Sequence, residues 1–353
     1  MSTASESTAP TASPEAAAPA ESKASRWANK SFVLHALRTT VRAIVLILFT
    51  VDCVRLALLY FWVQGAADVN FGRPQLSAGL SPLSGLFDLW TWVKTGQVDP
   101  ALPASMVIVL MGLIMSVFAK RSFCSWMCPV GTLFDALGVV GRRIFPGVHV
   151  SPKVQRVIQA PKFVLGLFVI GFVLFLVPTS TILVAWNAPY WRVSDMAVLK
   201  LFIQPGVPIA VVGLVVLGLS LLLGRNYWCH GLCPLGGIYG IASKASPLVV
   251  VRDPKACISC KACSRACGAH IAVDESTSPL RTGDCTGCME CVAACPAQGA
   301  LELRFFKKPV PLWMVPCAVL VIWIVVWVAA VALGVWYGTV TPEQIIMGMR
   351  TLG

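Results

Sequence analysis

Residues 257–267 read CISCKACSRAC and residues 285–295 read CTGCMECVAAC, and Pro296 follows the second stretch directly. Both stretches have the spacing C-x2-C-x2-C-x3-C. Three cysteines at two-residue gaps wrap one iron–sulfur cubane, and in two-cluster ferredoxins the fourth cysteine of each run ligates the other cluster. The spacing therefore predicts two [4Fe–4S] clusters that pass single electrons. The crossed assignment gives cluster 1 the ligands Cys257, Cys260, Cys263 and Cys295, and gives cluster 2 the ligands Cys285, Cys288, Cys291 and Cys267.

Other cysteine chemistry fits these stretches less well. Structural zinc also uses C-x2-C pairs, but zinc ribbons do not add a third and a fourth cysteine in this rhythm. A disulfide framework is typical of small secreted chains, whereas this segment is expected on the cytoplasmic side of a membrane. One departure from the usual pattern is Gly268, which follows Cys267 where proline is usual. This departure removes no ligand.

The composition indicates an integral membrane protein. Hydrophobic residues make up 57% of the chain and charged residues 12%, a balance that a water-soluble core does not need. A membrane span needs about 20 mostly apolar residues. Five stretches reach or approach that length: residues 41–63, 103–119, 163–186, 206–223 and 310–337. We expect a helical, multi-pass protein with about five transmembrane helices and a ferredoxin-like α+β module.

Charge predicts the orientation of the chain, because Lys and Arg in short loops stay in the cytoplasm. Basic residues gather before the first apolar stretch, after the second, and on both sides of the cysteine runs. The N-terminus and the ferredoxin-like module are therefore expected in the cytoplasm, and the C-terminus in the periplasm. The net charge of +12 follows from this bias, so it is poor evidence for a nucleic-acid partner.

A second cysteine motif occurs twice, as FCSWMCPVG at residues 123–131 and WCHGLCPLG at residues 228–236. Each copy follows two apolar stretches, which predicts a duplicated two-helix unit. Cysteines four apart share one helix face, and the proline after each pair predicts a helix break. If the copies pack side by side, Cys124, Cys128, Cys229 and Cys233 converge. Thiolates suit a third iron–sulfur centre or copper(I); a redox-active dithiol and a structural clamp are the alternatives that stay open.

These patterns divide the chain into five segments. Residues 1–38 form a polar disordered tail and a basic juxtamembrane segment, 39–140 and 141–249 the two transmembrane repeats, 250–306 the ferredoxin-like module, and 307–353 the last span and a short tail.

Polar and lone residues in or near the spans carry less information. Asp52 and Arg55 lie within the first stretch, where a charge is costly, and they predict either a proton or quinone head-group site or a mutual salt bridge. Cys53 and Cys317 are expected to be small buried hydrophobes. His230 is expected to face solvent or to stand beside the cysteine ligands. The sequence contains no haem-attachment motif, no G-x-G-x-x-G after a strand and no ATP-binding loop, so electrons must come from a partner or a membrane carrier.

Apolar stretches in pairs, each pair ending in C-x3-C-P and followed by the double cysteine run, resemble the NapH and MauN group of ferredoxin-type membrane proteins. The group is related to the membrane parts of NosR and CcoG, and the resemblance covers about residues 40–305. It implies an electron-transfer subunit of a quinol dehydrogenase in the bacterial inner membrane, serving anaerobic respiration. Such a subunit draws on the quinol pool and works with an extracytoplasmic iron–sulfur or reductase partner.

Two further functions stay open. The resemblance to CcoG suggests a copper-reducing factor for metal-site assembly that uses the C-x3-C-P thiols. A membrane regulator whose clusters sense redox poise is the other alternative. The fifth apolar stretch and the long polar tail depart from the NapH pattern.

Overall fold

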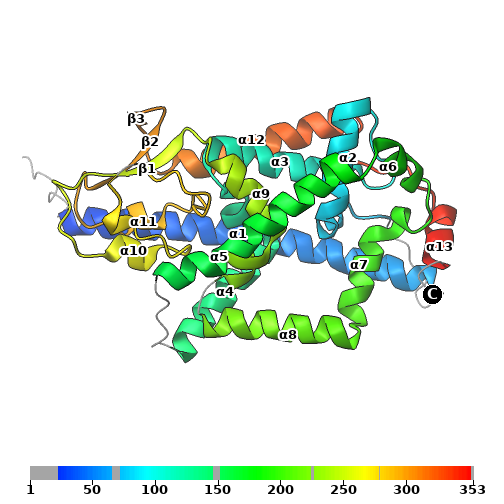
Figure 1. The fold of residues 1–353 in the computed structure, drawn as a ribbon, viewed down its shortest axis with the longest axis horizontal. Coiled ribbons are helices and arrows are strands. Elements are labelled where there is room, and N and C mark those ends of the chain that lie inside the picture. The colour runs from blue at the N-terminus through cyan, green and yellow to red at the C-terminus, as the bar shows by residue number, and fades with distance from the viewer. Residues whose placement is uncertain (1–22, 66–71, 146–151, 224–225, 278, 351–353) are drawn as a thin grey trace, which may run out of the picture.

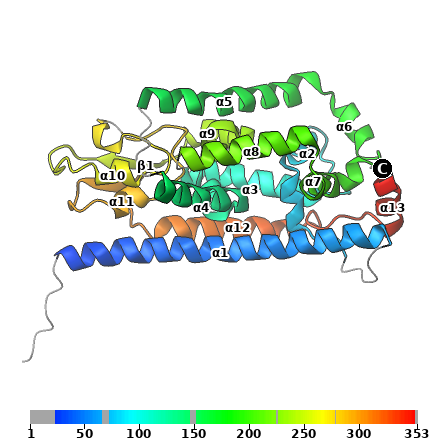
Figure 2. The ribbon, with the colours of Figure 1, turned by 90° about the horizontal axis from the view of Figure 1, so that it is seen from below.

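The computed structural model describes residues 23–65, 72–145, 152–223, 226–277 and 279–350. Its longer helices run roughly along the longest axis of the molecule, and a small module with a three-stranded sheet lies at one end of them (Figures 1 and 2). Most of the tail that we expect to be disordered falls in residues 1–22, outside the described residues.

The bundle contains both long and short helices. The longer apolar helices are α1 (Lys23–Val63), α3 (Pro103–Ala119), α5 (Pro152–Gly171), α8 (Val207–Leu222) and α12 (Met314–Ala332). Between and beyond them lie α2 (Pro82–Thr95), α4 (Pro129–Ile144), α6 (Thr179–Ala185), α7 (Ser194–Ile203), α9 (Pro234–Ser243) and α13 (Pro342–Arg350).

Several of these helices are suited to a membrane. Three stretches of the described chain are long and apolar enough to span one: Phe32–Val63, Val157–Leu176 and Met314–Ala332. A fourth results if Trp191–Ile203 and Val207–Leu222, which are bent by 76° at their junction, count as one broken span. The apolar helix α3 is shorter, at 17 residues. A mostly helical chain with several apolar helices is thus observed as expected, and the number of about five spans stays a prediction.

Two predicted spans have different boundaries in the structure. The stretch predicted at 163–186 is interrupted, because a π-helical turn at Phe172–Leu176 leads to Val177 in an extended conformation before Pro178. A residue before proline avoids the helical region, so α6 starts as a separate helix. The stretch predicted at 310–337 is helical only over α12, which is followed by Gly334 at a φ of 71°. Hydropathy does not register such chain breaks.

The two C-x3-C-P segments fold in the same local order: an apolar helix, a π-helical turn and a second helix. The π-turns span Phe123–Met127 and Trp228–Leu232, and each is closed by the amide of the second cysteine, with Cys128 N to Phe123 O at 2.9 Å and Cys233 N to Trp228 O at 2.8 Å. The following helices start at the prolines, which suit the first helical turn. Helix α3 packs against α9 and α4 packs against α8, so each segment covers part of the other.

The module at the end of the bundle is of mixed α and β structure, as expected. Strand β1 (Leu248–Arg252) pairs antiparallel with β2 (Leu301–Phe305), with Val250 opposite Leu303, and β3 (Lys308–Pro309) extends the sheet. The short helices α10 (Ala262–Ala266) and α11 (Glu290–Ala293) lie in the connection between β1 and β2. Both cysteine runs belong to this connection.

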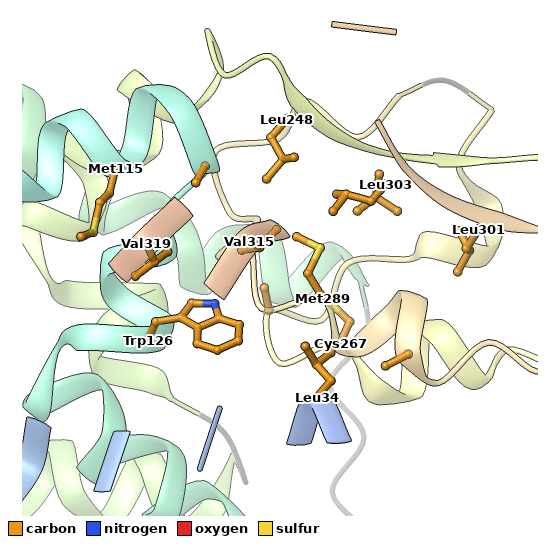
Figure 3. Close-up of a cluster of buried hydrophobic side chains, with 14 of the residues drawn as sticks. Leu34, Met115, Trp126, Leu248, Cys267, Met289, Leu301, Leu303, Val315 and Val319 are labelled. Atoms are coloured by element: carbon orange, nitrogen blue, oxygen red, sulfur yellow. The ribbon is translucent and has the colours of Figure 1, made fainter. Parts of the chain in front are cut away.

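One hydrophobic core joins the module to the bundle (Figure 3). Bundle side chains in it are Leu34 of α1, Met115 of α3, Trp126, and Val315 and Val319 of α12. Module side chains in it include Leu248, Met289 and Leu303. Burial of apolar area contributes about 25 cal/mol per Å², so this shared core fixes the module against the helix ends.

Candidate functional site

The first cysteine group, Cys257, Cys260, Cys263 and Cys295, lines one small pocket, together with Arg252 and Asp274. The first three come from the first run, and Cys295 comes from the end of the second run, after α11. The nearby thiols of the first run raise the pKa of Cys295, after burial as the main cause. Four thiols around one cavity are the donor set that a cubane requires, so these residues fit a [4Fe–4S] cluster.

The second cysteine group, Cys267, Cys285, Cys288 and Cys291, gathers on the bundle side of the module. Burial and, after it, the neighbouring Cys288 and Cys285 together raise the pKa of Cys267 to about 12. Burial, followed by Cys288, Cys267 and Cys285, raises the pKa of Cys291 well above its ordinary value. Thiols that repel one another in this way become stable thiolates when a metal centre supplies positive charge. The donor set fits a second cluster.

The backbone has the same form in both cysteine runs. Ser259 and Lys261 in the first run have φ values of 54° and 58°, and Gly287 and Met289, each 28 positions later, have φ values of 63° and 62°. Three of these four are not glycine, and left-handed backbone costs such residues about 1–2 kcal/mol. Successive amides in such turns form concave anion sites. Both runs are therefore shaped to surround a negatively charged group.

The two groups are neighbours. Cys263 of the first group is among the charges that act on Cys291 of the second, and α10 packs against α11. Among the described residues, no three His, Cys, Asp or Glu side chains are placed to hold a single metal ion.

The bundle contacts the first half of the second run and the two residues before it. These contacts are Arg121 Nη1 to Gly283 O at 3.4 Å, Lys162 Nζ to the Asp284 carboxylate, Ser125 Oγ to Thr286 O at 2.8 Å, Trp126 Nε1 to Gly287 O at 3.2 Å, and Arg38 Nη1 to Glu290 Oε1 at 2.8 Å. In the first run, by contrast, Cys260 is exposed and Ile258 is 65% exposed. The second cysteine group faces the bundle, and the first lies at the outer edge of the module.

The structure also brings the C-x3-C-P cysteines together. We call Cys124, Cys128, Cys229 and Cys233 the four-thiol group. Burial raises the pKa of Cys128 to about 12, with further contributions from Cys124 and Cys233. Burial, Cys128, Cys233 and Cys124 raise the pKa of Cys229 well above its ordinary value. The thiols of the two segments therefore share one site beneath the module.

Three buried cations beside these sites were missed by sequence reasoning. Lys120, Arg121 and Lys162 are 1%, 0% and 0% exposed. Lys120 Nζ donates to Ser243 O at 3.2 Å, and Lys162 pairs with Asp284. In the sequence these residues lie in basic loops or near expected helix ends, where Lys and Arg usually face water and indicate orientation. Only the position of Lys120 and Arg121 just before the first cysteine motif indicated a different role.

The remaining sequence candidates have varied surroundings. Asp52 pairs with Arg55 Nη1 at 3.4 Å and also accepts the backbone N–H of Leu76 at 3.0 Å, which are structural contacts. His230 is 6% exposed, so of its two expected surroundings the solvent-facing one is wrong; it is buried next to Cys229. Cys317 is exposed on its helix, so the expectation that it is buried is wrong. An exposed side chain on a membrane helix faces lipid, which is also apolar, so the sequence does not distinguish the two positions.

Comparisons with known proteins agree with this site. A family model described as a 4Fe-4S binding domain matches residues 101–146 and 205–253, and a 4Fe-4S dicluster domain matches residues 249–309. The chain is 33% identical over 298 residues to the putative electron transport protein YccM of Escherichia coli, which covers 81% of this chain and 82% of YccM.

More distant relatives carry ferredoxin-type names. The ferredoxin-type protein NapH of Escherichia coli is 26% identical over 55% of this chain and 67% of its own length. The methylamine utilization ferredoxin-type protein MauN of Paracoccus denitrificans is 30% identical over 52% of this chain and 63% of its own length. No solved structure is significantly similar. With iron–sulfur domains, apolar helices and these relatives, the chain belongs to the NapH/MauN-type family of ferredoxin-type electron-transport membrane proteins.

Proposed function

We propose that the protein relays single electrons between the quinol pool and a redox partner, through one [4Fe–4S] cluster in each cysteine group of the module. The observation that carries this proposal is the placement of the two groups. They adjoin each other, the second faces the apolar helix bundle, and the first reaches the module surface. Each cluster, when bound, supplies a one-electron carrier.

The residues of the chain have distinct parts in this relay. The second cysteine group is held against the bundle by Trp126 and Arg38, so it is the group suited to exchange electrons with the membrane side. The exposed Cys260 and Ile258 mark the edge at which a redox partner approaches. A partner at this edge lies on the same side of the membrane as the module. The extracytoplasmic iron–sulfur or reductase subunit that the relatives NapH and MauN suggest would instead exchange electrons through the quinol pool.

The same arrangement supports the proposed location in the bacterial inner membrane. Helix α1 begins at the end of the bundle that carries the module, and α13 lies at the opposite end (Figures 1 and 2). With basic residues concentrated at the module end, the N-terminus and the module would lie in the cytoplasm. The C-terminus would then lie in the periplasm.

Electron exchange with quinone tests this function. The full-length protein, purified without oxygen, is mixed with a soluble quinol analogue and, after dithionite reduction, with the matching quinone, while cluster spectra are recorded. We expect exchange in at least one direction. Clusters that dithionite reduces but that exchange electrons with neither form of the quinone would refute the relay.

Two single substitutions test the order of the groups. Cys288→Ser removes a ligand of the second group, and Cys260→Ser removes a ligand of the first group. We expect C288S to prevent exchange between quinone and the remaining cluster, whereas C260S leaves the second cluster in exchange. Dithionite reduction of the remaining cluster in each variant shows that the module has folded.

A further inference from the structure

The four-thiol group is built from both C-x3-C-P segments, each of which supplies only two cysteines. In each segment the second cysteine precedes a new helix, α4 after Cys128 and α9 after Cys233. Cys233 Sγ accepts the backbone N–H of Gly236 at 3.4 Å, and Cys128 accepts the backbone N–H of Gly131. Helix N-termini stabilise thiolates. Two helix N-termini therefore favour negative charge at one place.

Both motifs also share a glycine two residues after the proline, Gly131 and Gly236, and the packing around these glycines explains why. A Cβ at Gly236 would lie 2.9 Å from Cys229 O, and a Cβ at Gly131 would collide with Cys124 O. In both segments the backbone carbonyl of the first cysteine thus packs against the helical turn that follows the second cysteine. This close approach keeps the two thiols of each pair in one small space.

A buried positive charge faces the same space. Arg121 is fully buried, and its interacting charges include Cys124, Cys229 and Cys233. Its Nη2 donates to Cys229 O at 3.1 Å, while its Nε has no hydrogen-bond partner within the described part of the chain. A buried guanidinium with an unsatisfied N–H needs a nearby negative group.

The Asp284 carboxylate alone does not supply the negative charge that Arg121 needs. Asp284 interacts with Arg121, but it is already paired with Lys162, which is also fully buried. One carboxylate thus faces two cations. Thiolates of the four-thiol group would balance the excess, and thiolates at a buried site are stable when they ligate metal.

We propose that the four-thiol group holds one iron–sulfur centre, shared between the two segments, with Arg121 as its buried counter-charge. This centre is additional to the two clusters of the module. Four cysteine thiolates are the ligand set of [2Fe–2S] and [4Fe–4S] clusters. Arg121 contacts Gly283, two residues before the second run, which places the centre between the bundle and the second cysteine group.

Metal analysis of the full-length protein, purified without oxygen, tests the proposal first. Two cubanes account for about eight iron atoms per chain, so we expect about ten or twelve, with matching sulfide. A chain with about eight iron atoms would overturn the proposal, and this outcome requires no variant to fold. Copper or zinc bound in a stoichiometric amount in place of the extra iron would overturn it as well.

Substitution then locates the extra iron. Cys124→Ser combined with Cys229→Ser removes one ligand from each segment, and we expect it to lose the additional two or four iron atoms while both module clusters keep their EPR signals. The matched control combines Cys53→Ser with Cys317→Ser, lone cysteines in spans, and keeps the full iron content. Iron content unaffected by C124S and C229S would overturn the assignment. Failure of quinone exchange with the extra iron present would refute the relay alone.

Arg121 is tested by two replacements of different charge. Arg121→Gln removes the positive charge, and we expect this variant to lose the additional iron. Arg121→Lys keeps the positive charge, and we expect this variant to keep the additional iron. The EPR signals of the module clusters report folding in both variants. Full iron content in R121Q would show that Arg121 is not the counter-charge.

Discussion

Arg38 shows how single residues connect the bundle to the second cysteine group. Its Nη1 donates to Glu290 at 2.8 Å and its Nε donates to Ser125 O at 3.3 Å. The guanidinium also interacts electrostatically with Cys288. Arg42, one turn further along α1, pairs with Asp135 at 2.6 Å, a carboxylate that Arg38 Nη2 approaches only to 3.7 Å. The two arginines have the same side-chain exposure, 12%, so they form a matched pair.

Replacing Arg38 is expected to lower the reduction potential of the second cluster. A nearby positive charge stabilises the reduced, more negative form of a cluster, and Arg38→Gln removes it. Loss of the pair with the half-buried Glu290 should also cost about 1–3 kcal/mol of stability. EPR-monitored redox titration measures the potential. Arg42→Gln is the control; an equal shift in both variants would contradict the role given to Arg38.

Asp88, in a helix outside the candidate spans, predicts a pH dependence of stability. Burial and the neighbouring Asp99 raise the pKa of Asp88 to about 8, and its oxygens accept from Trp186 and Ser105. Between about pH 4 and pH 8 the folded chain keeps this proton while the unfolded chain loses it, so stability falls as pH rises through that window.

The Asp88→Asn variant removes this titration and keeps similar hydrogen-bonding capacity. We expect its thermal midpoint to fall less than that of the unchanged protein between about pH 5 and about pH 8. Thermal unfolding in detergent at both pH values measures the difference. Parallel pH profiles of the two proteins would rule out a raised pKa at Asp88.

At the scale of elements, close helix packing depends on glycine at defined positions. Gly237 of α9 lies so near the backbone of α5 that a Cβ would collide with Lys162 O. A Cβ added at Gly218 of α8 would meet no other atom of the described chain within 4 Å. The first glycine is needed for a contact between helices, and the second is not.

Alanine substitution separates these two glycines. Gly237→Ala should destabilise the protein by about 1–3 kcal/mol through overpacking, whereas Gly218→Ala should be neutral or stabilising by up to about 1 kcal/mol, since alanine favours helix. Thermal unfolding of the two variants in one detergent measures both effects. Equal stability of G237A and G218A would mean that α5 and α9 are not in this close contact.

Elements that depend on local sequence could be predicted, and elements that depend on contacts between distant segments could not. The C-P dipeptides predict the starts of α4 and α9 because proline acts locally. The π-helical turns before them were not predicted, since Cys124 and Cys128 at i and i+4 suit an ordinary helix equally well. The burial of Lys120, Arg121 and Lys162 depends on the packing of segments distant in sequence, which local patterns do not contain.

At the scale of the whole molecule, the arrangement predicts which ends of the bundle lie on the same side of the membrane. The turn at Phe306 and Lys307 joins β2 to β3 of the module. The exposed Gly96 directly follows α2, which lies at the end of the bundle away from the module (Figure 1). A protease site inserted at Lys307 should be cut in inverted inner-membrane vesicles, and one inserted at Gly96 should be cut in intact spheroplasts. Cleavage of both sites from the same side would contradict the proposed orientation.

The central claim is that two iron–sulfur clusters lie side by side in a module fixed to membrane helices. EPR spectroscopy of the full-length protein, extracted without oxygen and reduced with dithionite, tests it most directly. The close approach of the two cysteine groups predicts that the signals of the two module clusters are broadened by magnetic interaction with each other, and that this interaction is lost in Cys260→Ser. Absence of any iron–sulfur signal, or two signals that do not interact, would contradict the account.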